Sequence, residues 1–237
     1  MQTVEQTCGG PVSRPASPAA HGPHCCACGQ ALTHPVTVDR LTGLLDRWGW
    51  TDTAEPLFAD ARARGEDLAL LMLDLDRFKQ INDVLGHLAG DDALRAVGTA
   101  LASHTRGEDV VGRYGGDEFL LLLPGAGLPV AHRIAARAMA ALTAATVRVD
   151  TISGTTTTLT GLTASAGLAV FDAGHDTSLS RFILRADAAL RDAKQRGRGR
   201  LRVIGSRPPR PPADEGKRRL RLVPGVDTVS AFRFTEA

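Results

Sequence analysis

The sequence predicts a layered α/β or α+β fold in which helices and strands alternate around a mixed sheet. Three observations support this class. A continuous apolar run at 68–73 is typical of a strand buried on both faces. Two further strand patterns, at 110–114 and 119–123, flank a Gly-Gly turn that favours a tight hairpin. Segments with helical spacing of apolar residues separate and follow these strands.

The elements before the hairpin are mainly helical. Apolar residues recur at helical spacing over 41–48, and Asp39 is their candidate N-cap. A second helical stretch runs from about 53 to 64 and ends at a glycine. After the buried strand, a short helix is expected at 77–85 and a longer amphipathic one at 90–103.

The elements after the hairpin complete the alternation. An alanine-rich helix is expected at 129–144. Residues 155–171 are rich in Thr and Val, which favours one or two strands. The last amphipathic helix is expected at 179–195, and 201–204 form a short closing strand.

Composition places the chain among globular proteins. It has 237 residues, of which 43% are hydrophobic and 23% charged, and this excludes a wholly disordered chain. No apolar run is long enough to span a bilayer, and no signal-peptide core is present, so we expect a cytoplasmic protein without a transmembrane segment. The net charge of +2 conceals a basic C-terminal end, since residues 196–237 hold 11 Lys+Arg and 4 Asp+Glu.

Residues 1–35 have no regular period and predict a flexible leader. They contain a group of possible metal ligands: His21, His24, Cys25, Cys28 and His34. A structural zinc site needs four ligands, and a second Cys or His pair is not obvious. The Cys-x-x-Cys pair is alternatively a redox pair, or the thiols are simply reduced.

Residues 205–237 predict a basic, proline-rich tail. A solvated, disordered tail is one interpretation. Binding to nucleic acid or to anionic lipid is the other, and it lacks the support of interleaved aromatic residues.

Two acidic sites carry the chemistry of the chain. Asp74 and Asp76 follow the buried strand, and Asp117 and Glu118 lie at the Gly-Gly hairpin. If the two strands are neighbours, these carboxylates converge, and Mg²⁺ is bound by a few carboxylates together with substrate phosphates. The pattern therefore favours a metal-dependent nucleotidyl or phosphoryl transferase. A solvated acidic hairpin is the alternative.

Six ordered blocks of sequence resemble the GGDEF-domain diguanylate cyclase family. The signature is Arg-Tyr-Gly-Gly-Asp-Glu-Phe at 113–119, and the opening Asp-x-Leu-Thr-Gly-Leu turn is at 39–44. The block Asp-x-Asp-x-Phe-Lys-x-x-Asn-Asp spans 74–83, followed by Gly-His at 86–87 and Gly-Asp at 90–91. The C-terminal helix at 186–194 and the Gly-Arg at 197–198 complete the match. The resemblance covers 36–204 and implies one GGDEF domain.

The resemblance implies a nucleotidyl-cyclase-like palm fold with a central mixed, mainly antiparallel sheet of about five strands flanked by helices. It implies that Mg²⁺ or Mn²⁺ is held by Asp74, Asp117 and the carbonyl of Leu75, with Glu118 as a neighbouring catalytic acid.

The family match also implies substrate contacts. Asn82 and Asp91 would bind the guanine edge, which favours GTP over ATP because an Asp accepts from guanine N1–H and N2–H₂. His87 would lie beside the substrate. The phosphates would be held by Lys79, Lys194 and Arg198, and Arg113 would meet transition-state charge.

The implied reaction joins two GTP molecules into cyclic di-GMP and releases two pyrophosphates. Each 3′-hydroxyl attacks the α-phosphate of the other GTP. Because one site holds one GTP, catalysis requires a homodimer.

An Arg-x-x-Asp motif at 106–109 matches the spacing of the family's inhibitory product site. By resemblance, Arg106 and Asp109 bind cyclic di-GMP, and Arg137 can join them. A surface turn with a weak ion pair is the alternative.

The family pattern is not complete. Asp46, Arg191 and Gly199 replace its usual Asn, Tyr and Asn, and none of them is a proposed ligand. A second function class also stays open, namely a non-catalytic GGDEF effector that binds GTP or cyclic di-GMP and signals through a protein partner. The intact acids favour the enzyme.

Overall fold

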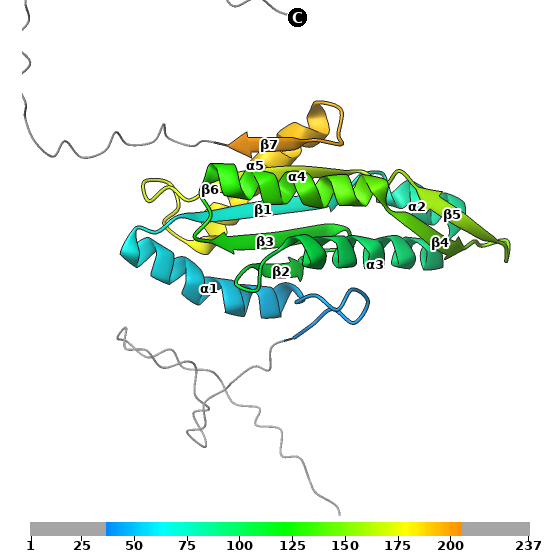
Figure 1. The fold of residues 1–237 in the computed structure, drawn as a ribbon, viewed down its shortest axis with the longest axis horizontal. Helices are drawn as coiled ribbons and strands as arrows, with labels where there is room; N and C mark the ends of the chain where they lie inside the picture. The colour runs from blue at the N-terminus through cyan, green and yellow to red at the C-terminus, as the bar shows by residue number, and fades with distance from the viewer. Residues whose placement is uncertain (1–36, 205–237) are drawn as a thin grey trace, which may run out of the picture. The chain divides into compact units, whose positions relative to one another are not determined.

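The central sheet is built around β1 (Leu68–Leu75), the middle one of its five strands. β3 (Glu118–Pro124) and β6 (Ala164–Val170) pair antiparallel with the two sides of β1. β2 (Val110–Arg113) pairs antiparallel with β3, and β7 (Leu201–Ile204) pairs parallel with β6. This mixed, mainly antiparallel sheet confirms the predicted fold class (Figure 1).

The computed structural model describes residues 37–204. The predicted leader at 1–35, with its Cys/His group, and the predicted basic tail at 205–237 lie outside the described residues. Their boundaries and roles stay predictions.

Helices cover both faces of the sheet. Alternate residues of β1 enter two separate cores. Leu71 and Leu73 face α3 (His87–His104) and α4 (Leu128–Ala144), whereas Leu70 faces α1 (Arg47–Arg64) and α5 (Leu179–Gln195). This division follows from the two-residue period of a strand, and it explains why the strand is apolar throughout. Each fully buried Leu contributes about 1.5–3 kcal/mol of hydrophobic stabilisation.

α1 and α5 thus cover one face of the sheet, and α3 and α4 cover the other. Among the described residues, no helix is both long and apolar enough to span a membrane.

A separate two-stranded hairpin lies at the end of the sheet where α2 (Phe78–Leu85) is found (Figure 1). It consists of β4 (Thr146–Asp150) and β5 (Thr156–Thr160), and its tip joins α2 through a 2.9 Å hydrogen bond from the Ile152 amide to the Leu85 carbonyl. β4 is not predicted from the sequence, because this strand is short and mostly exposed and contains no apolar run.

The N-terminal helices differ from the prediction. Residues 41–48 do not form a helix capped by Asp39; the Asp39 carboxylate instead accepts from the amide and hydroxyl of Thr42 and closes a turn. The helix begins at Arg47 and continues through Pro56 to Arg64, so the two predicted stretches are replaced by one helix. Its N-cap is Asp46, which accepts from the amides of the second and third helical residues.

Two tryptophans of α1 have different environments. Trp50 is fully buried, and its indole donates to the Val110 carbonyl at 3.1 Å, which ties α1 to the outer strand of the sheet. Trp48 is 70% exposed, so it is not a core residue.

Candidate active site

The two acidic segments meet at one end of the sheet. Asp74 lies directly opposite Glu118 in the antiparallel register of β1 and β3. The amide of Leu75 donates to the carbonyl of Asp117 at 3.2 Å, which keeps the Gly-Gly turn beside the end of β1. The register therefore brings together acids that are more than forty residues apart in the sequence.

Asp74 is buried and already has a cationic partner. Burial raises the pKa of Asp74, and the nearby charges of Asp117 and Glu118 raise this pKa further. The ammonium of Lys194, in the last turn of α5, acts in the opposite direction. Its Nζ lies 2.6 Å from Oδ2 of Asp74. This carboxylate thus lies where a positive charge is strongly favoured.

Asp76 has a structural environment. It is 7% exposed, and its two carboxylate oxygens accept from the Ser165 hydroxyl at 2.6 Å and from the Gly199 amide at 2.9 Å. Asp76 therefore fixes the glycine-rich segment that carries Arg198, and both of its oxygens have donors within the domain. The spacing of the two acids around Leu75 gave no signal for these contacts, because both partners are distant in sequence.

The Gly-Gly turn is held from outside by Arg113. Its Nε and Nη2 donate to the Gly116 carbonyl at 3.1 and 2.7 Å, and its Nη1 donates to the Asp39 carboxylate at 3.1 and 3.2 Å. The Glu118 carboxylate lies against Gly115, where an added Cβ would be 2.6 Å from Oε2. A glycine is therefore required at that position for Glu118 to keep this orientation.

A polar pair from two packed helices forms the next part of the site. Asn82 comes from α2 and Asp91 from α3, and both are partly buried. The side-chain oxygen of Asn82 is buried without a hydrogen-bond partner, and a Cβ at Gly90 would lie 1.9 Å from it. A buried amide oxygen without a partner is costly and indicates a place where a ligand donor can bind. His87, the first residue of α3, is exposed.

Basic side chains lie around the start of α2. Lys79 in its first turn is exposed, as is Arg198 after α5. Arg77 precedes α2 in a left-handed conformation, and no side chain caps this helix. In the described part of the chain, no ion pair involves Lys79, Arg77 or Arg198. These charges and the free amides of the helix start suit phosphate oxygens.

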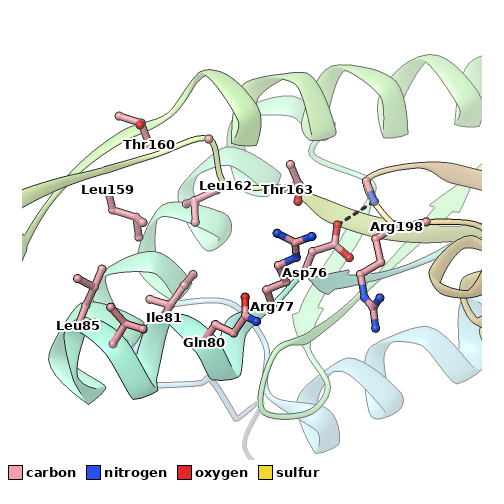
Figure 2. A pocket seen from close by; sticks show the side chains of 14 residues that line it. Asp76, Arg77, Gln80, Ile81, Leu85, Leu159, Thr160, Leu162, Thr163 and Arg198 are labelled. Carbon is pink, nitrogen blue, oxygen red and sulfur yellow. Dashed lines mark hydrogen bonds between the residues drawn. The ribbon is translucent and has the colours of Figure 1, made fainter.

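A cavity of about 560 Å³ opens on the flank of α2 that carries Gln80 and Ile81. Figure 2 shows Arg77 and Arg198 on either side of Asp76 at its polar end. Asn82 is not among the lining residues, so the cavity and the Asn82–Asp91 pair lie on different flanks of α2.

The Arg-x-x-Asp motif forms a closed turn before β2. Arg106 donates through Nε and Nη2 to the carboxylate of Asp109, and Nη2 also donates to the Pro124 carbonyl at 2.9 Å. The Asp109 side chain is fully buried. Arg137 is exposed on α4.

The donor set at the sheet end fits a magnesium ion that also contacts substrate. Within 37–204, no group of three or more His, Cys, Asp or Glu side chains is arranged to hold a metal ion. A substrate-bound Mg²⁺ needs only one or two carboxylates, with phosphates and water as further ligands. Asp74 and Asp117 are oxygen donors of the required kind, and the Lys194 contact shows that Asp74 accepts a cation.

The comparisons with known sequences agree with these motifs. Residues 36–200 match the family described as "Diguanylate cyclase, GGDEF domain". The chain is 38% identical over 176 residues to the diguanylate cyclase DgcP of Pseudomonas aeruginosa and 37% identical over 172 residues to DgcM of Escherichia coli K12. Each alignment covers 73% of this chain but only 24% and 39% of the relatives. The chain therefore spans less than half the length of these curated relatives.

Solved structures have the same fold. The GGDEF domain of DgcB from Caulobacter crescentus, in complex with c-di-GMP, has a TM-score of 0.65 at 30% identity and covers 73% of this chain and 98% of its own. The diguanylate cyclase SiaD of Pseudomonas aeruginosa, in complex with its activator SiaC, has a TM-score of 0.65 at 37% identity, over 70% of this chain and 61% of its own. With the family match extending over most of the described residues, these likenesses show that the chain belongs to the GGDEF-domain diguanylate cyclase family.

Proposed function

We propose that this chain is a diguanylate cyclase, which condenses two GTP molecules into cyclic di-GMP and releases two pyrophosphates. The observation that carries the proposal is the register of β1 with β3, which sets Asp74 opposite Glu118 at the sheet end. Acids, phosphate-binding cations and a polar pair suited to a base occupy that same end. We infer that the reaction takes place in the cytoplasm, where GTP is available.

Asp74, Asp117 and the Leu75 carbonyl would hold Mg²⁺ or Mn²⁺. When bound, the ion would polarise the attacked phosphate and lower the pKa of the attacking hydroxyl. The predicted zinc site in the Cys/His group at 1–35 lies outside the described residues and stays a prediction.

The Asn82–Asp91 pair would select guanine. The Asn82 oxygen lacks a donor, and the guanine N2–H₂ group supplies one. The Asp91 carboxylate would accept from N1–H and N2–H₂, which adenine does not offer on that edge. Loss of these bonds leaves buried polar atoms unpaired and so disfavours ATP. His87 would close the exposed side of this subsite.

Lys79, Lys194 and Arg198 would hold the triphosphate and neutralise the pyrophosphate as it leaves. The 3′-hydroxyl oxygen of one GTP forms a bond to the α-phosphorus of the other, the bond from that phosphorus to the bridging oxygen breaks, and the hydroxyl proton is lost. Glu118 is the acid at the hairpin that would accept this proton. The main role of Arg113 would be to hold the hairpin, because all three guanidinium nitrogens donate hydrogen bonds within the domain.

Two chains are needed for the complete reaction. One set of guanine and phosphate groups binds one GTP, whereas cyclic di-GMP contains two nucleotides. We therefore propose a homodimer in which two sites face each other. Product would bind at Arg106 and Asp109, with Arg137 as a further arginine, and this binding requires the closed turn to open.

Incubation of the purified chain with GTP and Mg²⁺, followed by mass spectrometry, tests the proposal. We expect cyclic di-GMP and pyrophosphate in a one-to-two ratio, and no cyclic product from ATP. Asp117→Ala should abolish turnover while leaving the circular dichroism spectrum unchanged. Absence of product at protein concentrations where a dimer is demonstrated would refute the enzyme and leave the GTP- or cyclic di-GMP-binding effector.

A further inference from the structure

The ion pair between Lys194 and Asp74 joins two residues that have different partners in the proposed reaction. Their charged atoms are 2.6 Å apart. Asp74 would hold the divalent cation, and Lys194 would hold the triphosphate. The ammonium contacts Oδ2 of Asp74, so it occupies the position from which a cation would coordinate that oxygen. The ammonium and a cation on Oδ2 therefore exclude each other.

The surroundings of Asp74 explain why a resident cation is needed. The residue is 7% exposed, and the register places Glu118 opposite it. A buried carboxylate beside another carboxylate is unfavourable without a positive partner. Lys194 supplies that charge from α5, which packs on β1.

Lys194 is also suited to leave. Its backbone is fixed by the fully buried Ala193, but its side chain is 33% exposed and reaches Asp74 from the rim of the site. Three neighbouring arginines are held elsewhere: Arg191 pairs with Asp187, and Arg196 and Arg202 pair with Asp192. Among the described residues, Lys194 is the cation that contacts Asp74, and its partly exposed side chain can move from there to a phosphate.

We propose that Lys194 is an internal counter-ion that competes with the divalent cation for Asp74 and is transferred to the triphosphate when GTP binds. This inference rests on the proposed function. Without nucleotide, a metal ion must displace the ammonium and leave it without a partner. With nucleotide, the displaced ammonium gains phosphate oxygens. The metal and GTP therefore bind cooperatively, and by linkage each raises the affinity for the other by the same factor.

Mn²⁺ binding to the free protein, measured by electron paramagnetic resonance without nucleotide, tests the competition. Lys194→Met should bind Mn²⁺ roughly tenfold more tightly than wild type, which corresponds to about 1.4 kcal/mol. Lys194→Gln should also bind Mn²⁺ more tightly than wild type, and it replaces the Met variant in the experiment if that variant does not fold. The matched control is Arg181→Met, which removes an exposed cation of the same helix that is in no ion pair within the described residues and should leave Mn²⁺ affinity unchanged.

The second measurement is the affinity for 3′-deoxy-GTP, which lacks the attacking hydroxyl. Lys194→Met should weaken its binding and reduce the factor by which it tightens Mn²⁺ binding. Unchanged or weaker Mn²⁺ affinity in both folded Lys194 variants would overturn the inference, even if wild type makes cyclic di-GMP. Tighter Mn²⁺ binding in a chain without turnover would support the counter-ion and refute only the proposed enzyme.

Discussion

Arg113 and Asp39 connect the Gly-Gly hairpin to the turn in which the described part of the domain begins. One nitrogen of the guanidinium donates to both oxygens of Asp39, and the other two donate to the Gly116 carbonyl. The side chains of this pair are 17% and 21% exposed, so the contact is only partly screened by water. A single side chain thus fixes the geometry of the turn that precedes Asp117.

This relationship predicts strong coupling between the two residues. We expect Asp39→Ala and Arg113→Ala each to lower kcat, and the double variant to be little worse than Arg113→Ala, with a coupling energy of about 0.5–3 kcal/mol. A double-mutant cycle on kcat measures it. If Arg113 acts only on transition-state charge, Asp39→Ala will have no effect on kcat and the effects will be additive.

The same pair predicts an acid-dependent loss of stability. Burial alone would raise the pKa of Asp39, but hydrogen bonds from Thr42 and the Arg113 guanidinium outweigh it and lower this pKa below 3.8. A carboxylate whose pKa is lowered by folding stabilises the folded protein at pH values above its unfolded-state pKa. This stability is lost as the pH falls through the folded-state pKa. Asp39→Asn should therefore flatten the decline of the unfolding free energy below about pH 4, by under about 1 kcal/mol. Parallel declines in both proteins would contradict the assignment.

A substitution at Gly90 tests the proposed guanine subsite. An alanine methyl at this position would lie 1.9 Å from the Asn82 oxygen and must displace the amide. We expect Gly90→Ala to weaken 3′-deoxy-GTP binding by roughly tenfold or more, about 1.4 kcal/mol. Gly98→Ala is the control in the same helix, because its methyl would meet Thr42 and not Asn82. Equal affinities in wild type and Gly90→Ala would remove Asn82 from the site.

Substitution of Arg106 is expected to change both the stability of the domain and its inhibition by product. Among the described residues, Arg106→Ala leaves the buried Asp109 carboxylate with only the backbone amide of residue 106 as a donor. We expect a loss of about 1–3 kcal/mol in unfolding free energy, towards the lower end because the guanidinium is partly exposed. Product inhibition, measured from progress curves with added cyclic di-GMP, should weaken.

Arg137→Ala provides the contrast, since this exposed side chain should affect inhibition without affecting thermal stability. Unchanged inhibition in both variants would show that product binds elsewhere.

The sequence predicts the sheet well because its strongest signals are local. The apolar run of β1 and the Gly-Gly turn between β2 and β3 each define their element without distant information. The N-terminal helix was placed less well, because Asp39 and Asp46 are equally good N-caps in sequence. The structure selects Asp46, since Asp39 is engaged by Thr42 and Arg113.

The site is predictable in its residue types but not in its internal contacts. The family resemblance implies roles for Asp74 and Lys194, yet their direct contact depends on how α5 packs on β1. The structural role of Asp76 likewise arises from Ser165 and Gly199, which approach only in the folded chain. Such contacts arise from tertiary packing, which local periodicity does not encode.

The outer edge of β2 has a consequence for how two copies can associate. Leu45 accepts from the Arg113 amide and donates to the Val111 carbonyl, so a short segment before α1 occupies the outward-facing backbone groups of this strand. A second chain cannot extend the sheet there while that segment is in place. In the homodimer proposed above, the two chains would therefore have to meet elsewhere than along this edge of β2, and no strand ladder through β2 would hold them together.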